Sequence, residues 1–359
     1  MHKTSRISGG QLVALLLASR LSNCLLLTPN SLDGVTLTDS VLATLLSGIL
    51  LFLLFLPTLL ALRRFRGRGL IDVAYLHGRP MGRVVCIAYV LLCLFILCLD
   101  IVQFYDFAEK SMKAGFSVTA LTVAIVAVAF AAAFYGIQAL GRTALLVAAF
   151  SAVCLIVFST ALVPEMRLLH FSPTVGSGFP AILRRAVAEL PRTAEVVAIG
   201  MLYPYIGGSR TGVAAVFSGL TVLFTALVSV TAMGVLGDFS SQVAYPYYTA
   251  VTAVQLGVFQ RMDILIITVW LSTFFVRMTL FCTLFLSVCS RVLGRRSRVP
   301  AAVIATLLLA GFTLLVSGGM PVGGWPWVTA VYWWVLGAFC LILPPVLRLM
   351  IKNKRRGAV

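Results

Sequence analysis

Ten apolar stretches, most of them about 20 residues long, alternate with short polar segments along this chain. They fall at residues about 11–28, 40–62, 83–105, 117–138, 143–163, 193–206, 211–236, 263–290, 299–317 and 328–350. A helix needs about 20 apolar residues to cross a ~30 Å hydrocarbon core, where its backbone must be satisfied internally. Because hydrophobic residues fill 60% of the 359 positions and charged residues only 11%, the chain lacks the polar surface of a soluble domain. We therefore predict an all-α polytopic membrane protein in which residues 1–359 form a single integral domain.

Lys and Arg gather in alternate loops of this arrangement. Cytoplasmic loops of membrane proteins retain these residues, so the alternation predicts that both termini lie in the cytoplasm. The formal net charge of +17 is then a consequence of topology, and the basic loops are expected to contact anionic membrane lipids. A nucleic-acid surface is not expected, because the cations are scattered over separate loops that join embedded helices.

Side chains that carry soluble-enzyme chemistry do not form recognisable motifs in this sequence. The eight cysteines all lie in apolar stretches without a CxxC pair, and the three histidines are far apart in tails or loops. Cysteines in such positions usually pack as small apolar side chains. A Walker loop, a GxGxxG turn and a nucleophile elbow are also missing from the sequence. We predict no catalysis, no metal and no cofactor.

The ten spans divide into two halves of five, at about residues 7–163 and 190–351. Since each half has an odd number of spans, the second half enters the membrane in the opposite orientation, which makes an inverted repeat. Transporters built this way bind their solute where the first helix of each half is broken. Two further helices are expected on the outer side, at about 180–190 and 244–260, and the second would lie on the membrane or cap the bundle.

Polar residues interrupt the first span and the sixth span. In the first, the polar sequence at 19–23 (Ser-Arg-Leu-Ser-Asn) separates two apolar runs. The sixth, near 193–206, is short, contains Glu195 and meets Pro204. We interpret both as discontinuous helices. The alternative is a continuous first helix that packs its polar side on its neighbours, and a sixth helix ended by proline.

Three segments resemble the endospore germination permeases, the B subunits of nutrient germinant receptors (GerAB-like). The opening RISGGQL is similar to the Ile-Ser-x-x-Gln start of this family, and TAEVV followed by Tyr203-Pro204 resembles the Glu and Pro of its sixth helix. The segment YPYYTAVTAVQLGVFQRMDILIITVW resembles its pattern of Tyr-Pro, Phe, Arg, an acid and Trp before the eighth helix. The third segment is the only one that is specific on its own.

The resemblance implies membership of the amino acid, polyamine and organocation transporter superfamily, with a LeuT-like fold. It implies an amino-acid-sized pocket between helices 1, 3, 6 and 8, and assembly with A and C receptor subunits in the spore inner membrane. The implied function is to bind a small amino acid-like germinant and to signal to these partners that germination should start. An amino acid secondary transporter is the alternative, and a scaffold for a partner lipoprotein is a third interpretation.

The candidate ligand-binding residues lie at the two interrupted helices: Ser19, Arg20, Ser22, Asn23, Glu195, Ala198 and Ile199. The first span lacks the glycines that commonly let backbone approach a substrate carboxylate in this superfamily. Arg20 stands there instead, and its guanidinium could bind a ligand carboxylate bidentately or pair with Glu195 or Asp100 for stability. For Glu195, a pocket wall and an interfacial position are both open, and for Asp100 we favour the level of the lipid headgroups.

Arg277 lies about fourteen residues into the apolar stretch of the eighth span. A charge at that depth is costly and usually marks a function. In sodium-coupled relatives of the implied fold a cation bridges helix 1 to helix 8. We hypothesise that Arg277 forms this electrostatic link and makes sodium unnecessary, the alternative being an arginine paired purely for stability.

Four residues at the ends of these helices are gating candidates: Tyr203, Pro204, Arg261 and Asp263. For Arg261 and Asp263, an ion pair on the outer surface is the alternative. An aromatic set near the start of the last span, which includes Tyr332, is expected to form an interfacial belt.

Overall fold

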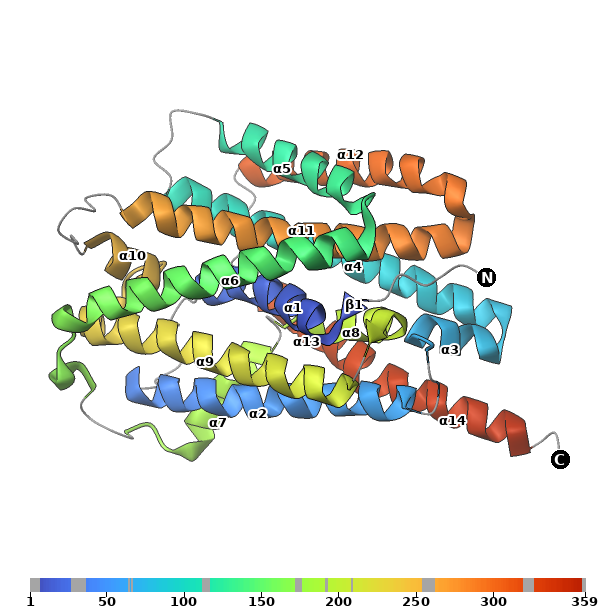
Figure 1. The fold of residues 1–359 in the computed structure, drawn as a ribbon, viewed down its shortest axis with the longest axis horizontal. Coiled ribbons are helices and arrows are strands. Elements are labelled where there is room, and N and C mark those ends of the chain that lie inside the picture. The colour runs from blue at the N-terminus through green and yellow to red at the C-terminus, as the bar shows by residue number, and fades with distance from the viewer. Residues whose placement is uncertain are drawn as a thin grey trace.

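The computed structural model describes residues 7–26, 37–63, 65, 67–111, 117–171, 176–190, 193–207, 209–253, 262–318 and 326–356. Most helices lie roughly along one long axis (Figure 1). The short helix α3 (Leu70–His77) and the end of α14 (Leu343–Arg356) lie at one end, which we call the α3 end. The helix α10 (Pro246–Ala253) lies at the opposite end, which we call the α10 end.

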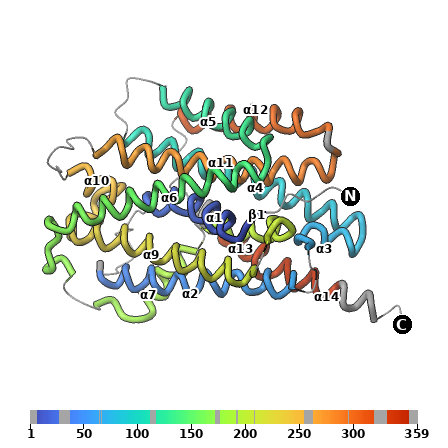
Figure 2. The backbone as a smooth tube through the Cα atoms, viewed as in Figure 1, coloured from blue at the N-terminus to red at the C-terminus, as the bar shows by residue number. Residues whose placement is uncertain are grey.

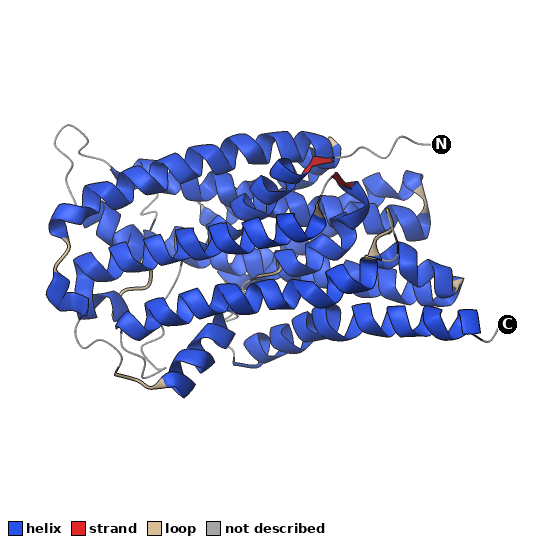
Figure 3. Cartoon of the chain, turned by 60° about the horizontal axis from the view of Figure 1, so that its bottom comes forward, coloured by secondary structure: helices blue, strands red, loops and turns tan. Residues whose placement is uncertain are grey.

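The first half of the chain consists of β1 (Ile7–Ser8), α1 (Gly9–Cys24), α2 (Leu37–Leu62), α3, α4 (Arg79–Ser111), α5 (Val118–Ala133) and α6 (Gly136–Leu162). Short helical turns η2 (Val163–Glu165) and η3 (Leu168–Phe171) then lead to α7 (Phe179–Glu189). The second half contains α8 (Glu195–Leu202), η5 (Tyr203–Tyr205), β2 (Ile206–Gly207), α9 (Arg210–Leu236), η6 (Gly237–Ser241), α10, α11 (Met262–Leu293), η7 (Arg295–Ser297), α12 (Arg298–Ser317), α13 (Pro326–Gly337), the π-helical turn η9 (Ala338–Ile342) and α14. Nearly all of the described chain is helical (Figure 3).

Seven helical segments of the described chain are long and apolar enough to cross a membrane. They lie in α2, α4, α6, α9, α11 and α12, and in residues 331–350 of the last span. The chain is an integral membrane protein. The remaining three predicted spans correspond to α1, α5 and α8, which have 16, 16 and 8 residues. The division into repeats at 7–163 and 190–351 stays a prediction.

Helix α1 begins with a capping box. The Ser8 hydroxyl accepts a hydrogen bond from the Gln11 backbone N–H at 3.1 Å, and the Gln11 side chain accepts one from the Ser8 N–H at 3.0 Å. These bonds satisfy donors that a helix start otherwise leaves free. Just before this cap, Ile7 and Ser8 pair in parallel with Ile206 and Gly207. The start of α1 is therefore tied to the segment that follows α8.

The prediction that residues 19–23 break the first helix is wrong in its position. The helix runs through them to Cys24, and the polar side chains at 19, 20, 22 and 23 are all buried within the protein. Because the protein interior surrounds these side chains, the helical backbone has no reason to unwind there. At a rise of 1.5 Å per residue, sixteen residues span only about 24 Å, so α1 is nevertheless too short to cross the membrane alone.

Helix α11 lies at the centre of the bundle and packs against α1, α4, α5 and α6. Figure 2 shows α5 and α12 along one side of this group and α2 and α9 along the other. Helix α7 packs on α2, where Ile182 and Ala186 bury against Ala43. Helix α10 packs on α9 and α11 and caps that end of the bundle. Helices thus occur near both predicted positions, although residues 254–260 of the second lie outside the described chain, and their outer location stays a prediction.

Candidate functional site

Two ion pairs join at Arg277 in the middle of the bundle. The Arg277 Nε donates to Asp100 Oδ1 at 2.8 Å, and its Nη1 donates to Glu195 Oε1 at 2.6 Å. The three side chains are 3%, 4% and 0% exposed, respectively. Charged hydrogen bonds of this length are strong, and in a dry interior each charge depends on the others for compensation.

The Ser19 hydroxyl extends these contacts to the first helix, because it donates to Glu195 Oε1 at 2.6 Å. We call Ser19, Asp100, Glu195 and Arg277 the central network. Its members come from α1, α4, α8 and α11, which correspond to the helices 1, 3, 6 and 8 of the predicted pocket. Glu195 is the first residue of α8, a position where the helix dipole favours a negative charge.

The central network has unused hydrogen-bond acceptors. Within the described chain, Asp100 Oδ2 and Glu195 Oε2 are buried and have no hydrogen-bond partner. The three charged groups of the network carry one positive and two negative formal charges. Buried carboxylate oxygens are costly when they lack a partner. The spare capacity of this site is therefore that of an acceptor for a positively charged donor.

Aromatic side chains cover the network toward the α10 end. Trp270 of α11 stacks on Phe104 and Phe274, with ring centroids 5.5 and 5.4 Å apart, and packs against Phe107 at 4.2 Å. Its indole N–H also donates to the Ser22 carbonyl oxygen at 3.1 Å. Trp270 thus satisfies a carbonyl near the end of α1 while its ring fills the space between α4 and α11.

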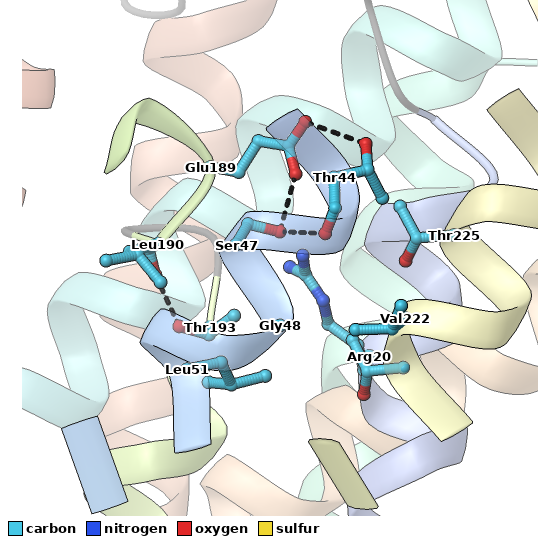
Figure 4. A pocket seen from close by; sticks show the side chains of 11 residues that line it. Arg20, Thr44, Ser47, Gly48, Leu51, Glu189, Leu190, Thr193, Val222 and Thr225 are labelled. Atoms are coloured by element: carbon cyan, nitrogen blue, oxygen red, sulfur yellow. Dashed lines mark hydrogen bonds between the residues drawn. The ribbon is translucent and has the colours of Figure 1, made fainter. Parts of the chain in front are cut away.

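A second polar cluster surrounds Arg20 (Figure 4). The guanidinium, buried like the rest of this side chain, points into a cavity of about 10 Å³ between α1, α2, α9 and the segment before α8. Thr44 and Ser47 of α2 donate to the carboxylate oxygens of Glu189 at 3.3 and 3.0 Å. The Thr221 hydroxyl lines the same cavity without a hydrogen-bond partner among the described residues. A cavity of this size and polarity suits one water molecule.

The structure therefore separates two neighbouring candidates on α1. Ser19 belongs to the central network, whereas Arg20 points between α2 and α9. Ser22 donates its hydroxyl to the Ser19 carbonyl oxygen at 2.8 Å, and Asn23 is buried. Ala198 and Ile199 are buried in α8.

The gating candidates are spread over different parts of the molecule. Tyr203 is buried in η5, with the Arg210 guanidinium 4.3 Å from the centre of its ring. Pro204 is in the same turn, at the α3 end, and its gating role stays a prediction. Asp263 lies at the start of α11, and Arg261 lies outside the described residues.

Two expectations about the buried charges need correction. Asp100 is not at the level of the lipid headgroups, because α4 continues for eleven residues beyond it to Ser111 and its carboxylate faces Arg277. The link from Arg277 to helix 1 is indirect: among the hydrogen bonds of the described residues, Arg277 donates to the two acids, and Ser19 of α1 is reached through Glu195. Within the described residues Arg277 is thus paired with acids, and its function as a substitute for a bridging sodium ion stays a prediction.

The sequence interpretation missed two contributors to the site. Tyr332 of α13 is 8% exposed and lies close enough to Arg277, Glu195 and Asp100 to interact with their charges, so it is not part of an interfacial belt. Trp270 is a member of the motif before the eighth span, yet the apolar pattern around it gives no indication that it reaches the end of α1. A solute-sized hollow was also expected at the broken helices, whereas the cavity beside Arg20 has the volume of one water molecule.

A family model described as spore germination protein matches residues 6–317. The chain belongs to the spore germination protein family. Among solved structures, this spore germination protein is similar to Mhp1, a nucleobase-cation-symport-1 family transporter in a closed conformation with bromovinylhydantoin bound. The identity is 15%, the TM-score is 0.66, and the likeness covers 95% of this chain and 78% of that chain. It confirms the LeuT-like transporter fold, while a comparison with curated proteins finds no match.

Proposed function

We propose that this chain is the membrane subunit of a spore nutrient germinant receptor, which binds a small amino acid-like germinant and signals to A and C partner subunits. The observation that carries the proposal is the central network, in which Arg277 links Asp100 and Glu195 across four helices. Transporters with inverted repeats bind their solutes near the middle of the bilayer, at discontinuous helices. Glu195 begins the short α8, which in this proposal is the discontinuous helix of the second half.

The spare acceptor oxygens of Asp100 and Glu195 support a ligand with a protonated amine, because an ammonium group offers three N–H donors and no acceptor. Arg20 is the candidate for the ligand's carboxylate, through its fork of N–H donors. It follows Ser19 directly on α1 but faces a different side. The two clusters would therefore bind opposite ends of a zwitterion.

The compact interior supports a signalling role for such a ligand. The described cavity beside Arg20, about 10 Å³, is too small for an amino acid, so binding requires the helices to move apart. A ligand that binds only the expanded conformation shifts the equilibrium toward it. That shift is what partner subunits would sense.

We further propose that the α3 end faces the cytoplasm and that the subunit resides in the spore inner membrane. Arg68, Arg83 and Arg291 near α3 support this orientation, because cytoplasmic ends of spans are rich in arginine. In the same proposal Arg277 supplies a fixed positive charge between helices 3, 6 and 8. Binding of the germinant is then independent of sodium.

Ligand binding by the purified full-length chain tests the proposal. Amino acids would be screened by thermal shift, and hits measured by isothermal titration with and without sodium. Glu195→Gln should weaken binding about tenfold or more, because it removes a charge-assisted hydrogen bond worth about 1.5–3 kcal/mol. Glu165→Gln is the matched control, since Glu165 is exposed in η2, and it should bind normally. Equal binding by wild-type protein and Glu195→Gln would refute the assigned site.

The likeness to a transporter favours a second candidate function, that of an amino acid secondary transporter. Proteoliposomes that contain only this chain would accumulate a bound amino acid if it transports, whereas a receptor subunit would affect germination only with its partners present. A scaffold without a ligand site is the third reading. Bulky substitutions such as Ser22→Leu and Ala198→Leu would then leave signalling intact.

A further inference from the structure

Two cavities lie in line at the α3 end. The larger, about 560 Å³, opens between α3, η5 and the end of α11, and Arg68 and Tyr75 are among its lining residues. The smaller, about 20 Å³, lies further inside and is lined in part by Met201, Leu284 and Ser287. We call them the mouth cavity and the inner cavity.

The two cavities share the side chains of Asp72, Tyr205 and Arg291. These side chains therefore form the wall between the open mouth and the enclosed space behind it. Asp72 belongs to α3, Tyr205 to η5 and Arg291 to the last turn of α11. Movement of any of these elements would connect the mouth cavity with the inner cavity.

The inner cavity points toward the central network. Leu284 lies seven residues after Arg277 on α11, which is about two turns or ~10 Å along the helix. Met201 lies six residues after Glu195 on α8. Both residues thus extend from network helices into the cavity. At the opposite end the network is covered by the stacked rings around Trp270, so the α3 end is the side on which the interior comes closest to water.

Helix α3 rests directly on α8 through two glycines. A methyl group on Gly69 would lie 3.1 Å from the Gly200 carbonyl oxygen and 3.2 Å from the Pro204 ring. A methyl group on Gly200 would lie only 2.6 Å from the Leu70 side chain. The start of α3 and the end of α8 therefore touch at the closest separation that the backbone allows, and a shift of α8 must move against α3.

An ion pair holds α3 on α11 from the other side. Arg291 donates to Asp72 Oδ1, while Asp72 Oδ2 accepts from the Gly69 N–H at 2.9 Å and caps α3. The Arg291 and Asp72 side chains are 30% and 31% exposed. Ion pairs that are this accessible to water contribute little stability, so the contact can open and close readily.

We propose that α3 is the gate of a passage between the α3 end and the central network, and that the Asp72–Arg291 ion pair holds it closed. When the pair opens, α3 loses its contact with α11 and the wall between the two cavities is removed. Movement of α8 would do the same through Gly200. The identity of the solute rests on the proposed function, but the gate itself requires no ligand.

Chemical accessibility of Ser287 tests the gate. The full-length chain carrying Ser287→Cys would be placed in lipid nanodiscs, in which both faces are open to solvent. Methanethiosulfonate ethylsulfonate, a small membrane-impermeant anion, would be added, and labelling of position 287 followed by peptide mass spectrometry. Asp72→Asn and Arg291→Gln, each added to this background, should speed labelling about two- to fivefold, the shift that a partly exposed ion pair can produce. Exchange of the charges, Asp72→Arg with Arg291→Asp, should return the rate to the starting value.

Two further variants make the result decisive. Gly200→Ala should also speed labelling, because its methyl group displaces Leu70 through a contact that involves no charge. Asp106→Asn breaks the Asp106–Lys110 pair, which is 2.7 Å long and lies on α4 near the α10 end, and should leave the rate unchanged. Size-exclusion profiles identify any variant that fails to fold, and labelling rates are compared among the variants that fold. Unchanged labelling in the Asp72, Arg291 and Gly200 variants, or equal acceleration by Asp106→Asn, would overturn the gate. Since no ligand is added, this outcome is independent of whether the chain binds a germinant.

Discussion

Replacing Arg277 by methionine should destabilise the protein strongly, because it leaves two acids without their counter-charge. Arg277 makes the hydrogen bonds of 2.8 Å to Asp100 and 2.6 Å to Glu195, and all three side chains are at least 96% buried. Removing one partner of a buried ion pair typically costs about 3–5 kcal/mol. An unfolding entropy of about 2.1 cal/mol/K per residue over 359 residues corresponds to about 0.75 kcal/mol/K. We therefore expect Arg277→Met to lower the apparent Tm by about 4–7 °C.

A thermal assay with detection by size-exclusion chromatography would measure this change in the purified chain. Arg142→Met is the matched control, because Arg142 is exposed on α6, and its Tm should stay within about 1 °C of wild type. The decisive variant combines Arg277→Met with Asp100→Asn and Glu195→Gln, which removes all three charges. If uncompensated charge is the cause, this triple variant should recover most of the lost stability. A triple variant that is no more stable than Arg277→Met alone would refute the electrostatic explanation and leave lost packing as the cause.

Three further changes test individual contacts by the same thermal assay unless stated. Gly48→Ala should lower the free energy of unfolding by about 1–3 kcal/mol or more through overpacking, because its methyl group would lie 1.7 Å from Val222. Gly219→Ala is the control and should be tolerated, because its methyl group would meet nothing within 4 Å. Equal Tm values for both would contradict the close packing of α2 on α9. Trp270→Phe should lower the free energy of unfolding by about 1 kcal/mol, because it removes the hydrogen bond to the Ser22 carbonyl oxygen. Trp270→Ala should lower it by about 3–5 kcal/mol, because it also removes the ring. A Phe variant as unstable as the Ala variant would mean that the ring stack contributes little. Asp39→Ala should raise the rate of hydrogen exchange at the Gly176 and Ser177 amides, which donate to Asp39 at 3.1 and 2.7 Å. Asp238→Ala, at an exposed position, should leave these rates unchanged. Unchanged exchange in Asp39→Ala would contradict the role of Asp39 in holding this segment.

The local pattern of the chain was sufficient to locate most spans. Apolar runs long enough to cross a membrane predicted α2, α4, α6, α9, α11 and α12 to within a few residues at most ends. The short α8 was also anticipated, because Glu195 and Pro204 limit its apolar run to a few residues. These features depend on the side chains of neighbouring residues and on the solvent around them, so they can be predicted without knowledge of tertiary contacts.

Hydropathy misled the interpretation where polar side chains found partners far away in the sequence. Ser19 and Asp100 stand 176 and 95 residues from Glu195, yet all three carboxyl and hydroxyl groups meet around Arg277. The polar cluster at 19–23 therefore remains helical, and Asp100 lies at the centre instead of the headgroups. A count of polar residues along one helix cannot distinguish a break from a buried face, because the difference lies in the neighbouring helices.

The sequence alone determined that this chain is a helical membrane protein of the spore germination type, and it marked Arg277 as a buried charge that requires compensation. Those conclusions follow from local composition, since lipid excludes unpaired charge and unsatisfied backbone at any position. Only the tertiary structure decided which acids compensate Arg277, that Arg20 faces away from them, and that α3 packs against α8. Such choices depend on distances between segments that are far apart along the chain, and packing of the whole bundle sets those distances.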